Sequence, residues 1–257
     1  MDILNSYPTD LDFLTTNVAF FAENIFRIGK NFLVVPGIRM EFINNTANGR
    51  LNISGNNELK INDQNKTRQF LLPGIGAEYH IGQTEIYGNY SQAYRPVLFS
   101  DLTGNPTLDE IDQNLKDAKG FNIDLGYRGR IKDFLFFDIS GYVLQYNNRV
   151  GLITQQRLDG NFYNLRTNVG NSTSKGVEGL VEFSPVKFFK INPAFGNITV
   201  FASLAYINAK YQNMRVVVKE GNSLVETNLK NKSIENAPEQ IYRTGITYSK
   251  KQLTVTA

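Results

Sequence analysis

The segment Phe121-Asn-Ile-Asp-Leu-Gly-Tyr-Arg128 decides the fold that we expect for this chain. Its odd-numbered residues are Phe, Ile, Leu and Tyr, and its even-numbered residues are Asn, Asp, Gly and Arg. Side chains alternate between the two faces of a β-strand, so this period of two indicates a strand with one apolar and one polar face. The segment therefore predicts a sheet whose two faces meet different surroundings.

The same period recurs along the chain and predicts about ten strands. We expect no helix longer than a turn or two. Pro36 and Pro73 fall inside two of the patterns, where the missing N–H should disturb the ladder locally. The other expected strands are Val18–Ile28, Phe32–Phe42, Phe70–His80, Thr84–Tyr94, Leu135–Val143, Ser174–Phe183, Ile198–Tyr211, Ile241–Tyr248 and one beginning at Leu253.

The connections between these strands alternate in length. Short turns are expected at Gly29–Asn31, Ile81–Gln83, Gly129–Asp133 and Ser249–Gln252. Long polar connections are expected at Asn44–Lys66, Arg95–Asp117, Asn147–Asn171 and Gln212–Gln240, with Ser184–Asn197 as an intermediate case. This order predicts an all-β, antiparallel up-and-down meander and is typical of outer-membrane barrels. A soluble β-sandwich or propeller is the alternative.

Composition narrows the function classes. The chain has 257 residues, 41% hydrophobic and 12% aromatic, so intrinsic disorder is not expected. It has no Cys and one His, which excludes disulfides and multi-His or Cys-ligated metal sites, and its net charge of +3 does not indicate a nucleic-acid partner. The longest apolar runs have about six residues, far short of the roughly 20 in a membrane-spanning helix, whereas barrel strands remain possible.

The residues on the two faces of the expected strands indicate whether each face meets water or lipid. Ionic residues such as Arg39, Glu41, Asp124 and Arg128 would face a wet lumen, and the apolar faces would meet lipid. In a soluble protein the apolar faces would instead pack against each other. Aromatic residues near the strand ends would form an interfacial girdle. They are Phe32, Phe42, Tyr94, Tyr127, Phe134, Phe183 and Tyr248.

No motif predicts an enzyme, a catalytic residue or a cofactor. Glycine-rich nucleotide-binding motifs are missing. Asp109–Asp112 could offer oxygen ligands to a cation but lacks the spacing of a calcium loop, so we interpret it as a solvated loop. His80 lies on the polar face of its strand, and we expect a hydrogen-bonded side chain rather than a metal ligand.

Basic residues in and beside the long connections form the candidate binding site. Arg95, Arg149, Arg157 and Arg166 carry planar guanidinium groups that match carboxylates and phosphates. Tyr94, together with other tyrosines near these arginines, could add contact surface. We predict an anionic-ligand pocket at the outer mouth of the barrel. Solvated loop charge, or contact with lipopolysaccharide phosphates, is the alternative.

The segments Asn89–Leu102 and Asp112–Gly129 resemble TonB-dependent outer-membrane receptors, with the closest likeness to the ferric dicitrate type. The runs Phe21–Gly29 and Thr167–Glu178 fit the same family, so the likeness covers nearly the whole chain. The Ser-Lys-Gly-Val-Glu run that begins at Ser174 is common to many such receptors, whereas Tyr-Arg-Pro-Val-Leu-Phe-Ser-Asp-Leu, which begins at Tyr94, points to the narrower group.

The resemblance implies an outer-membrane receptor with about 22 strands around a plug domain, which imports an iron chelate with energy delivered through TonB. Residues 1–257 would form part of the barrel domain, with about ten strands, and the signal peptide, the plug, the TonB-contacting segment and other strands would lie outside this sequence. Expected partners are the iron chelate, TonB through the missing N-terminal part, and outer-membrane lipid and lipopolysaccharide. A different cargo, such as cobalamin or a glycan, is the alternative within the family.

Overall fold

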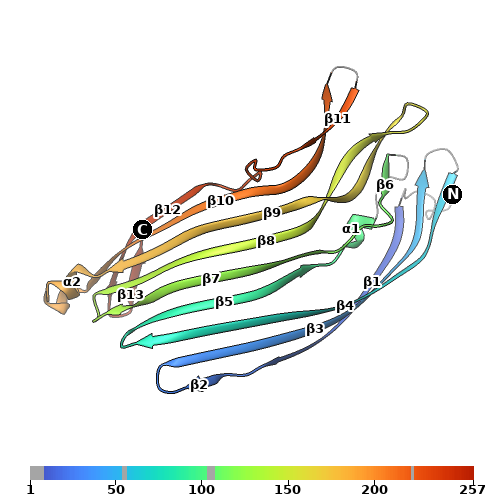
Figure 1. The fold of residues 1–257 in the computed structure, drawn as a ribbon. Coiled ribbons are helices and arrows are strands. Elements are labelled where there is room, and N and C mark those ends of the chain that lie inside the picture. Colours follow the sequence, from blue (N-terminus) through green and yellow to red (C-terminus); the bar gives the residue numbers. More distant parts are fainter. Residues whose placement is uncertain (1–8, 54–56, 103–107, 221–222) are drawn as a thin grey trace.

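The computed structural model describes residues 9–53, 57–102, 108–220 and 223–257, and nearly all of them belong to one sheet (Figure 1). Within these ranges the sheet contains 13 strands, and two very short α-helices and one 3₁₀ turn at Pro193–Phe195 lie in its connections. The elements are β1 (Thr9–Glu23), β2 (Phe26–Ile28), β3 (Phe32–Ile53), β4 (Asn57–Ile81), β5 (Thr84–Arg95), α1 (Phe99–Leu102), β6 (Asp109–Ile111), β7 (Ala118–Ile131), β8 (Leu135–Gln156), β9 (Phe162–Phe183), α2 (Pro185–Phe188), β10 (Asn197–Glu220), β11 (Ser223–Asn228), β12 (Gln240–Lys250) and β13 (Leu253–Thr256).

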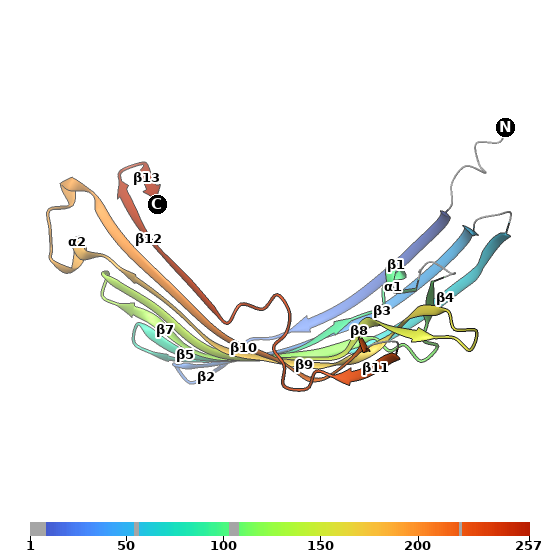
Figure 2. The same ribbon diagram turned by 90° about the horizontal axis from the view of Figure 1, so that it is seen from above.

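Ten strands form the main path of the sheet, in the order β1-β3-β4-β5-β7-β8-β9-β10-β12-β13, and every neighbouring pair is antiparallel. This confirms the predicted up-and-down meander. The short strands β2, β6 and β11 pair beside this path, and β6 is the exception because it runs parallel to β9. The sheet curves into an open trough, as Figure 2 shows.

The register assigns a chemistry to each face. Leu125, Gly141, Val177 and Tyr206 form one row across four neighbouring strands, and Leu125 and Val177 are 64% and 53% exposed. The opposite face carries the ionic residues; for example, Glu85, Arg128 and Asp138 are paired across three strands. We call these the apolar face and the ionic face.

The ionic face is the concave one. Phe13 lies on the same side of β1 as Phe21, which is paired with Arg39 of the ionic face. The Phe13 ring stacks on Phe99 of α1, with 4.6 Å between the centroids, and α1 lies inside the trough (Figure 2). The exposed apolar rows of the central strands, with Leu125, Ile139 and Val177, therefore lie on the convex surface, as on the lipid side of a barrel wall.

Only nine hydrophobic residues are buried in the part of the chain that the structure describes. A soluble domain of this size would bury most of its large apolar side chains between two layers. In the described ranges there is one layer, and its apolar side faces outward. This arrangement removes the soluble two-layer alternative. No helix among the described residues has the length and hydropathy needed to cross a membrane.

The segments Asn44–Lys66 and Asn147–Asn171 are largely strand, so the prediction of long irregular connections there is wrong. β3 and β4 continue through the first of them, and β8 and β9, of 22 residues each, through the second. A barrel strand needs only about 9–11 residues to cross the bilayer. These hairpins therefore extend beyond the membrane, where both faces are wet and the period of two disappears from the sequence.

The apolar face ends at an identifiable level toward these long hairpins. Ile123 and Val143 are the last apolar pair of β7 and β8 before Gln145, which accepts a hydrogen bond of 2.6 Å from Thr173 and donates one of 2.9 Å to Gln212 on the same face. Polar pairs on this surface favour water over hydrocarbon. Residues beyond Gln145 and its register partners therefore lie outside the membrane-spanning segments.

Aromatic residues line the other end of the convex surface, near the short turns. Tyr79 pairs with Phe32, and the Tyr127 ring lies 5.1 Å from that of Phe137. Phe134 and Phe183 follow along the same end, 6.2 Å apart. This row is the arrangement expected of an interfacial girdle. Tyr94 does not belong to it, because it lies at the opposite end of the sheet.

Both prolines stand where a ladder is interrupted. Pro36 lies in β3 opposite the gap between β1, which ends at Glu23, and β2, which begins at Phe26. Pro73 comes one residue before Gly74, where the ladder between β4 and β5 ends. Proline lacks the N–H that a ladder requires, so the predicted local disturbance is present at both places. The second interruption opens the place where the candidate site is built.

Candidate functional site

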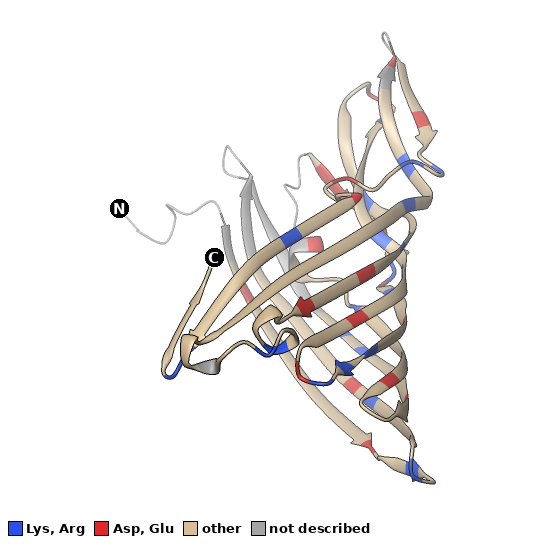
Figure 3. Cartoon of the chain, turned by 90° about the vertical axis from the view of Figure 1, so that its left-hand side faces the viewer, with Lys and Arg blue, Asp and Glu red and all other residues tan. Residues whose placement is uncertain are grey.

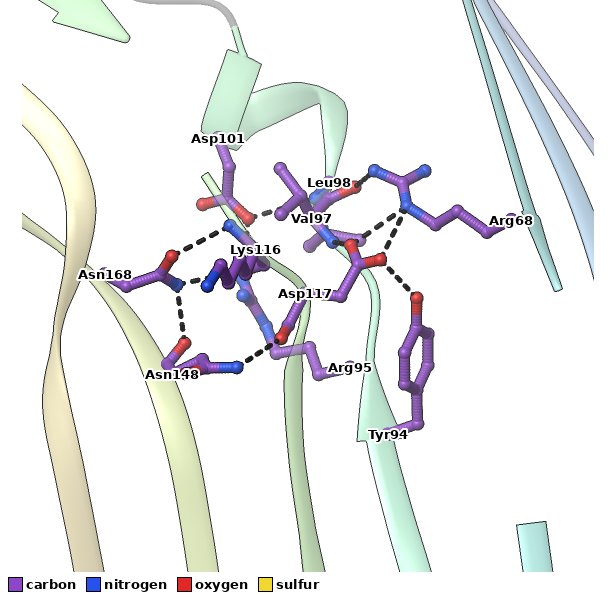
Figure 4. Close-up of polar contacts among 10 residues, drawn as sticks. All are labelled: Arg68, Tyr94, Arg95, Val97, Leu98, Asp101, Lys116, Asp117, Asn148 and Asn168. Atoms are coloured by element: carbon purple, nitrogen blue, oxygen red, sulfur yellow. Dashed lines mark hydrogen bonds and ion pairs between the residues drawn. The ribbon is translucent and has the colours of Figure 1, made fainter. Parts of the chain in front are cut away.

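A carboxylate closes the split between β4 and β5. Beyond Gly74 and Ser91 the two strands no longer pair, and the chain after β5 folds back toward the gap (Figure 4). Asp117 accepts hydrogen bonds from Arg68 Nε at 2.9 and 3.1 Å and from the Val97 backbone N–H at 2.8 Å, and the Tyr94 hydroxyl donates a further one. The Asp117 clamp therefore joins β4, β5 and the start of β7.

The cation and the phenol in this clamp are both sheltered. Arg68 is 6% exposed and donates a further hydrogen bond to the Val97 carbonyl oxygen at 3.1 Å, while its Nη1 is buried without a partner among the described residues. The Tyr94 ring stacks on Phe70 with 3.6 Å between the centroids. Burial, followed by the hydrogen bond to Asp117, raises the pKa of the Tyr94 phenol, so the phenol stays protonated and donates.

A second carboxylate, Asp101 of α1, gathers two of the predicted arginines. It accepts hydrogen bonds from Arg95 Nη2 and Arg166 Nη1, both at 3.1 Å, and from the Leu98 backbone N–H at 3.0 Å. The Asp101 side chain is 8% exposed, whereas the Arg95 side chain is 39% exposed. Two guanidinium groups share one carboxylate, which leaves a net positive charge on this side of the loop.

Asn168 of β9 holds the returning chain against the hairpin of β8 and β9. Its side-chain oxygen accepts the Lys116 backbone N–H at 2.8 Å, and its amide nitrogen donates to the carbonyl oxygens of Lys116 and Asn148, both at 2.9 Å (Figure 4). The Asn148 side chain donates in turn to the Asp117 carbonyl oxygen at 3.3 Å. These hydrogen bonds hold the backbone at Lys116 and Asp117 against β8 and β9.

Asp109–Asp112 is docked rather than solvated, which corrects the sequence-based interpretation. β6 pairs in parallel with Asn164–Arg166 of β9. Asp112 accepts a hydrogen bond of 2.5 Å from the Thr167 hydroxyl and one of 2.8 Å from the Asn114 backbone N–H. The hydrogen bond from Thr167, followed by the one from Asn114, lowers the pKa of the Asp112 carboxyl.

The remaining predicted arginines lie on the hairpin of β8 and β9. Arg157 donates to Glu110 at 2.8 and 3.1 Å, and its guanidinium lies 4.9 Å from the centre of the Tyr163 ring. Arg149 donates to the Ser172 hydroxyl at 3.2 Å and lies 5.0 and 5.8 Å from the rings of Tyr146 and Tyr211. Within the described ranges no ion pair joins Arg149 to a carboxylate.

His80 lies at the opposite end of the ionic face, among acidic side chains. Its Nδ1 is 3.1 Å from a Glu85 oxygen, and its Nε2 is 3.6 Å from a Glu78 oxygen. These three residues are close enough together to ligate a cation. Arg128, however, contacts both glutamates and already supplies positive charge to the cluster. His80 thus lies within ion-pair distance of two carboxylates, and its predicted hydrogen bond stays a prediction.

The structure brings Arg95 and Arg166 together and places Tyr94 next to that pair in the Asp117 clamp, whereas Arg149 and Arg157 occupy separate positions along the hairpin.

Sequence reasoning missed Arg68, Asp101 and Asp117. The signal available for Arg68 was its spacing of two residues from Phe70, which places it on the same face of the strand. No comparable signal existed for the two aspartates, because their positions depend on how the loop folds.

A family model, "TonB dependent receptor-like, beta-barrel", matches residues 2–256. The chain belongs to this family. Its members are outer-membrane β-barrels that act as transport receptors, which confirms the predicted fold class, the outer-membrane location and the expectation that the protein is not an enzyme. A comparison with curated protein sequences found no match.

Solved structures with the same fold include three transporters. The ferric-catecholate import receptor Fiu from K12 E. coli is 18% identical, with a TM-score of 0.65 over 96% of this chain and 34% of Fiu. The ferric citrate transporter FecA, unliganded, is 18% identical, with a TM-score of 0.65 over 96% of this chain and 32% of FecA. The copper transporter OprC is 18% identical, with a TM-score of 0.63 over 95% of this chain and 35% of OprC. The chain thus spans about a third of the length of these structures.

Proposed function

We propose that the protein containing residues 1–257 imports an iron chelate with carboxylate ligands, ferric dicitrate or another siderophore, across the outer membrane, powered through TonB. The strands of this chain form part of the barrel wall, and the connections at the long-hairpin end capture the chelate. The metal enters as part of the cargo, so no protein ligand to iron is required. Lipid and lipopolysaccharide surround the convex surface.

The environment of Arg149 is the observation that supports an anionic cargo best. Its guanidinium lies 5.0 and 5.8 Å from the centres of the Tyr146 and Tyr211 rings on the ionic side of the sheet, and it donates a hydrogen bond to a neutral hydroxyl, that of Ser172. A cation without a carboxylate counterion can form charge-assisted hydrogen bonds with a carboxylate cargo. The two tyrosine rings add cation–π attraction that holds the guanidinium on this face of the sheet.

Arg95 and Arg166 support the same proposal through charge. Both contact Asp101, so the three groups together carry one excess positive charge. The more exposed Arg95 can turn a donor toward a ligand while Arg166 keeps its contact with Asp101. Tyr94 positions this region through the Asp117 clamp, and Arg157, paired with Glu110, belongs to the rim of the hairpin.

The test uses alanine substitution of Arg149 in the full-length protein and measures binding and uptake of radiolabelled ferric citrate by cells at limiting chelate concentration. Loss of one charge-assisted contact should weaken binding by about tenfold or more. Lys119→Ala is the matched control, because Lys119 belongs to the same region of the sheet but to the convex side. Equal uptake by the Arg149 variant and the wild type would contradict the assignment of Arg149.

Cargo identity has a separate test. Growth on ferric citrate, other siderophores, cobalamin or glycans as the limiting nutrient distinguishes the proposed cargo from the alternatives. The similarity to OprC, described as a copper transporter, illustrates that this fold alone does not choose the cargo. Growth supported by cobalamin or a glycan, and not by any iron chelate, would contradict the proposed function.

A further inference from the structure

The turn between β9 and β10 forms a groove with the neighbouring hairpin of β12 and β13. The groove has a volume of about 500 Å³ and lies at the short-turn end of the sheet. Val186, Ile191 and Ala194 supply apolar walls from the turn, and Ser249 and Lys250 close the other side. Because two separate segments build it, the groove is a feature of the folded sheet and not of one loop.

Four lysines rim this groove: Lys187 and Lys190 from the turn, and Lys250 and Lys251 from the hairpin. Figure 3 shows basic residues in both segments, with the hairpin identified by the C-terminus that follows it. All four side chains are exposed, and no ion pair between them and a carboxylate is found in the described part of the chain. The groove therefore combines apolar walls with four uncompensated positive charges.

The groove lies at the level where a bilayer meets water. Phe188 of α2 packs edge-on against Phe134 at 5.0 Å and lies 5.4 Å from Phe183, so the turn continues the aromatic row on the convex surface. Tyr248 donates a hydrogen bond of 3.0 Å to the Phe195 carbonyl oxygen. Phe189 and Phe195 are 67% and 72% exposed. Exposed aromatic rings beside lysines are typical of a segment that lies in the headgroup region.

We propose that this groove binds the phosphate-bearing headgroup of an anionic glycerophospholipid from the periplasmic leaflet. The ammonium groups of the four lysines donate hydrogen bonds to phosphate oxygens, and the apolar walls contact the start of the acyl chains, which continue along the convex surface. Short turns face the periplasm in outer-membrane barrels, which assigns the leaflet. The inference depends on the barrel orientation and not on the cargo.

Charge complementarity favours a lipid over other occupants. Basic residues near a membrane surface gain attraction from each anionic lipid, and apolar side chains next to them add burial in the acyl region. A small soluble anion would use the lysines but leave the apolar walls and the exposed phenylalanines in water. A zwitterionic lipid would use the walls but would not balance the four positive charges.

The experiment compares lipid retention by the full-length protein and two variants. The protein is purified in detergent, mixed with phosphatidylglycerol or phosphatidylethanolamine, and bound lipid is counted by native mass spectrometry. The test variant replaces Lys187, Lys190, Lys250 and Lys251 by Gln. The control variant replaces Lys30 and Lys132, from two other short turns, by Gln. Heat-modifiable migration on gels checks that both variants fold, and a charge-preserving variant with Arg at the four positions serves as a second measurement.

We expect the wild type, the control and the Arg variant to retain phosphatidylglycerol at least about tenfold better than the test variant, since each basic residue adds to the attraction. None of these proteins should retain phosphatidylethanolamine in preference to phosphatidylglycerol. Equal retention by the test variant and the wild type would overturn the proposal. Displacement of the lipid by millimolar inorganic phosphate or glycerol phosphate would overturn it as well, because the site would then recognise the anion alone.

Discussion

At the scale of single residues, Asp117 holds together the segments that form the candidate site. It is the counterion of Arg68, a buried guanidinium, and it also receives Tyr94 and the Val97 backbone. Removing its charge by Asp117→Asn leaves a buried cation unpaired, and we expect a loss of about 3 kcal/mol in the free energy of unfolding. Urea unfolding of the full-length protein in lipid vesicles measures this loss.

The control for that prediction is the pair of Arg39 and Glu41, in which the Arg39 side chain is 49% exposed. Breaking it by Glu41→Gln should cost less than about 1 kcal/mol. The double variant Arg68→Met with Asp117→Asn should lose less stability than the sum of the two single variants, because it leaves no buried charge. Additive losses would show that Arg68 and Asp117 do not act as a pair.

At the scale of elements, the docking of β6 on β9 should depend on pH. The hydrogen bonds from Thr167 and Asn114 favour the ionised Asp112 carboxylate and lower its pKa below the usual value of about 3.9. Their stabilisation is therefore complete above the unfolded-state pKa and is lost as the pH falls through the lowered, folded-state pKa. The protection factor of the Asp109–Ile111 amides, which compares their exchange rate with the intrinsic rate at the same pH, should be the same at pH 7 and pH 5 and should begin to fall below about pH 3.9.

The variant Asp112→Asn provides the comparison for the pH experiment. It cannot carry the charge, so its Asp109–Ile111 amides should have the lower protection factor already at pH 7, with no further change from this group on acidification. If the protection factor of the wild type began to fall near neutral pH, a different group would control the docking of β6.

A glycine controls how closely β7 and β8 approach each other. A Cβ atom at Gly120 would lie 1.8 Å from the Gln145 carbonyl oxygen, a backbone atom that cannot move away without breaking the ladder. We expect Gly120→Ala to cost at least about 1–3 kcal/mol and to reduce the folded fraction in refolding experiments. Gly179→Ala is the control, because a Cβ there meets nothing within 4 Å. Equal refolding of the two variants would contradict the predicted clash.

At the scale of the whole molecule, β1 and β13 are the edges of the sheet in the described structure, because each pairs with one neighbour on the main path. An unpaired backbone group in hydrocarbon costs several kcal/mol. We therefore expect residues 1–257, expressed alone, not to insert into bilayers as stable monomers. A protease-resistant, heat-modifiable monomer in detergent or vesicles would show that the open sheet is stable by itself.

The sequence predicted the fold where one side of a strand meets lipid, and it failed where both sides meet water. Phe121–Arg128 keeps a strict period of two because the bilayer enforces it. Asn44–Lys66 has polar residues on both faces, so its sequence pattern predicts a loop where the structure has strands. In the site, Arg95 and Arg166 could be nominated by residue type. Their meeting on Asp101 depends on tertiary folding of the loop, which no local pattern encodes.

The most direct test measures which side of the wall contacts lipid. Residues 1–257 contain no Cys, so a single cysteine introduced there can be labelled with bimane in the full-length protein. The convex positions to label are Leu125 and Ile139, and the concave positions are Asp124 and Asp138. In vesicles containing doxyl-labelled phospholipids, we expect strong quenching at Leu125 and Ile139 and little at Asp124 and Asp138. Equal quenching at adjacent positions, or stronger quenching at the two aspartate positions, would contradict the membrane-barrel account.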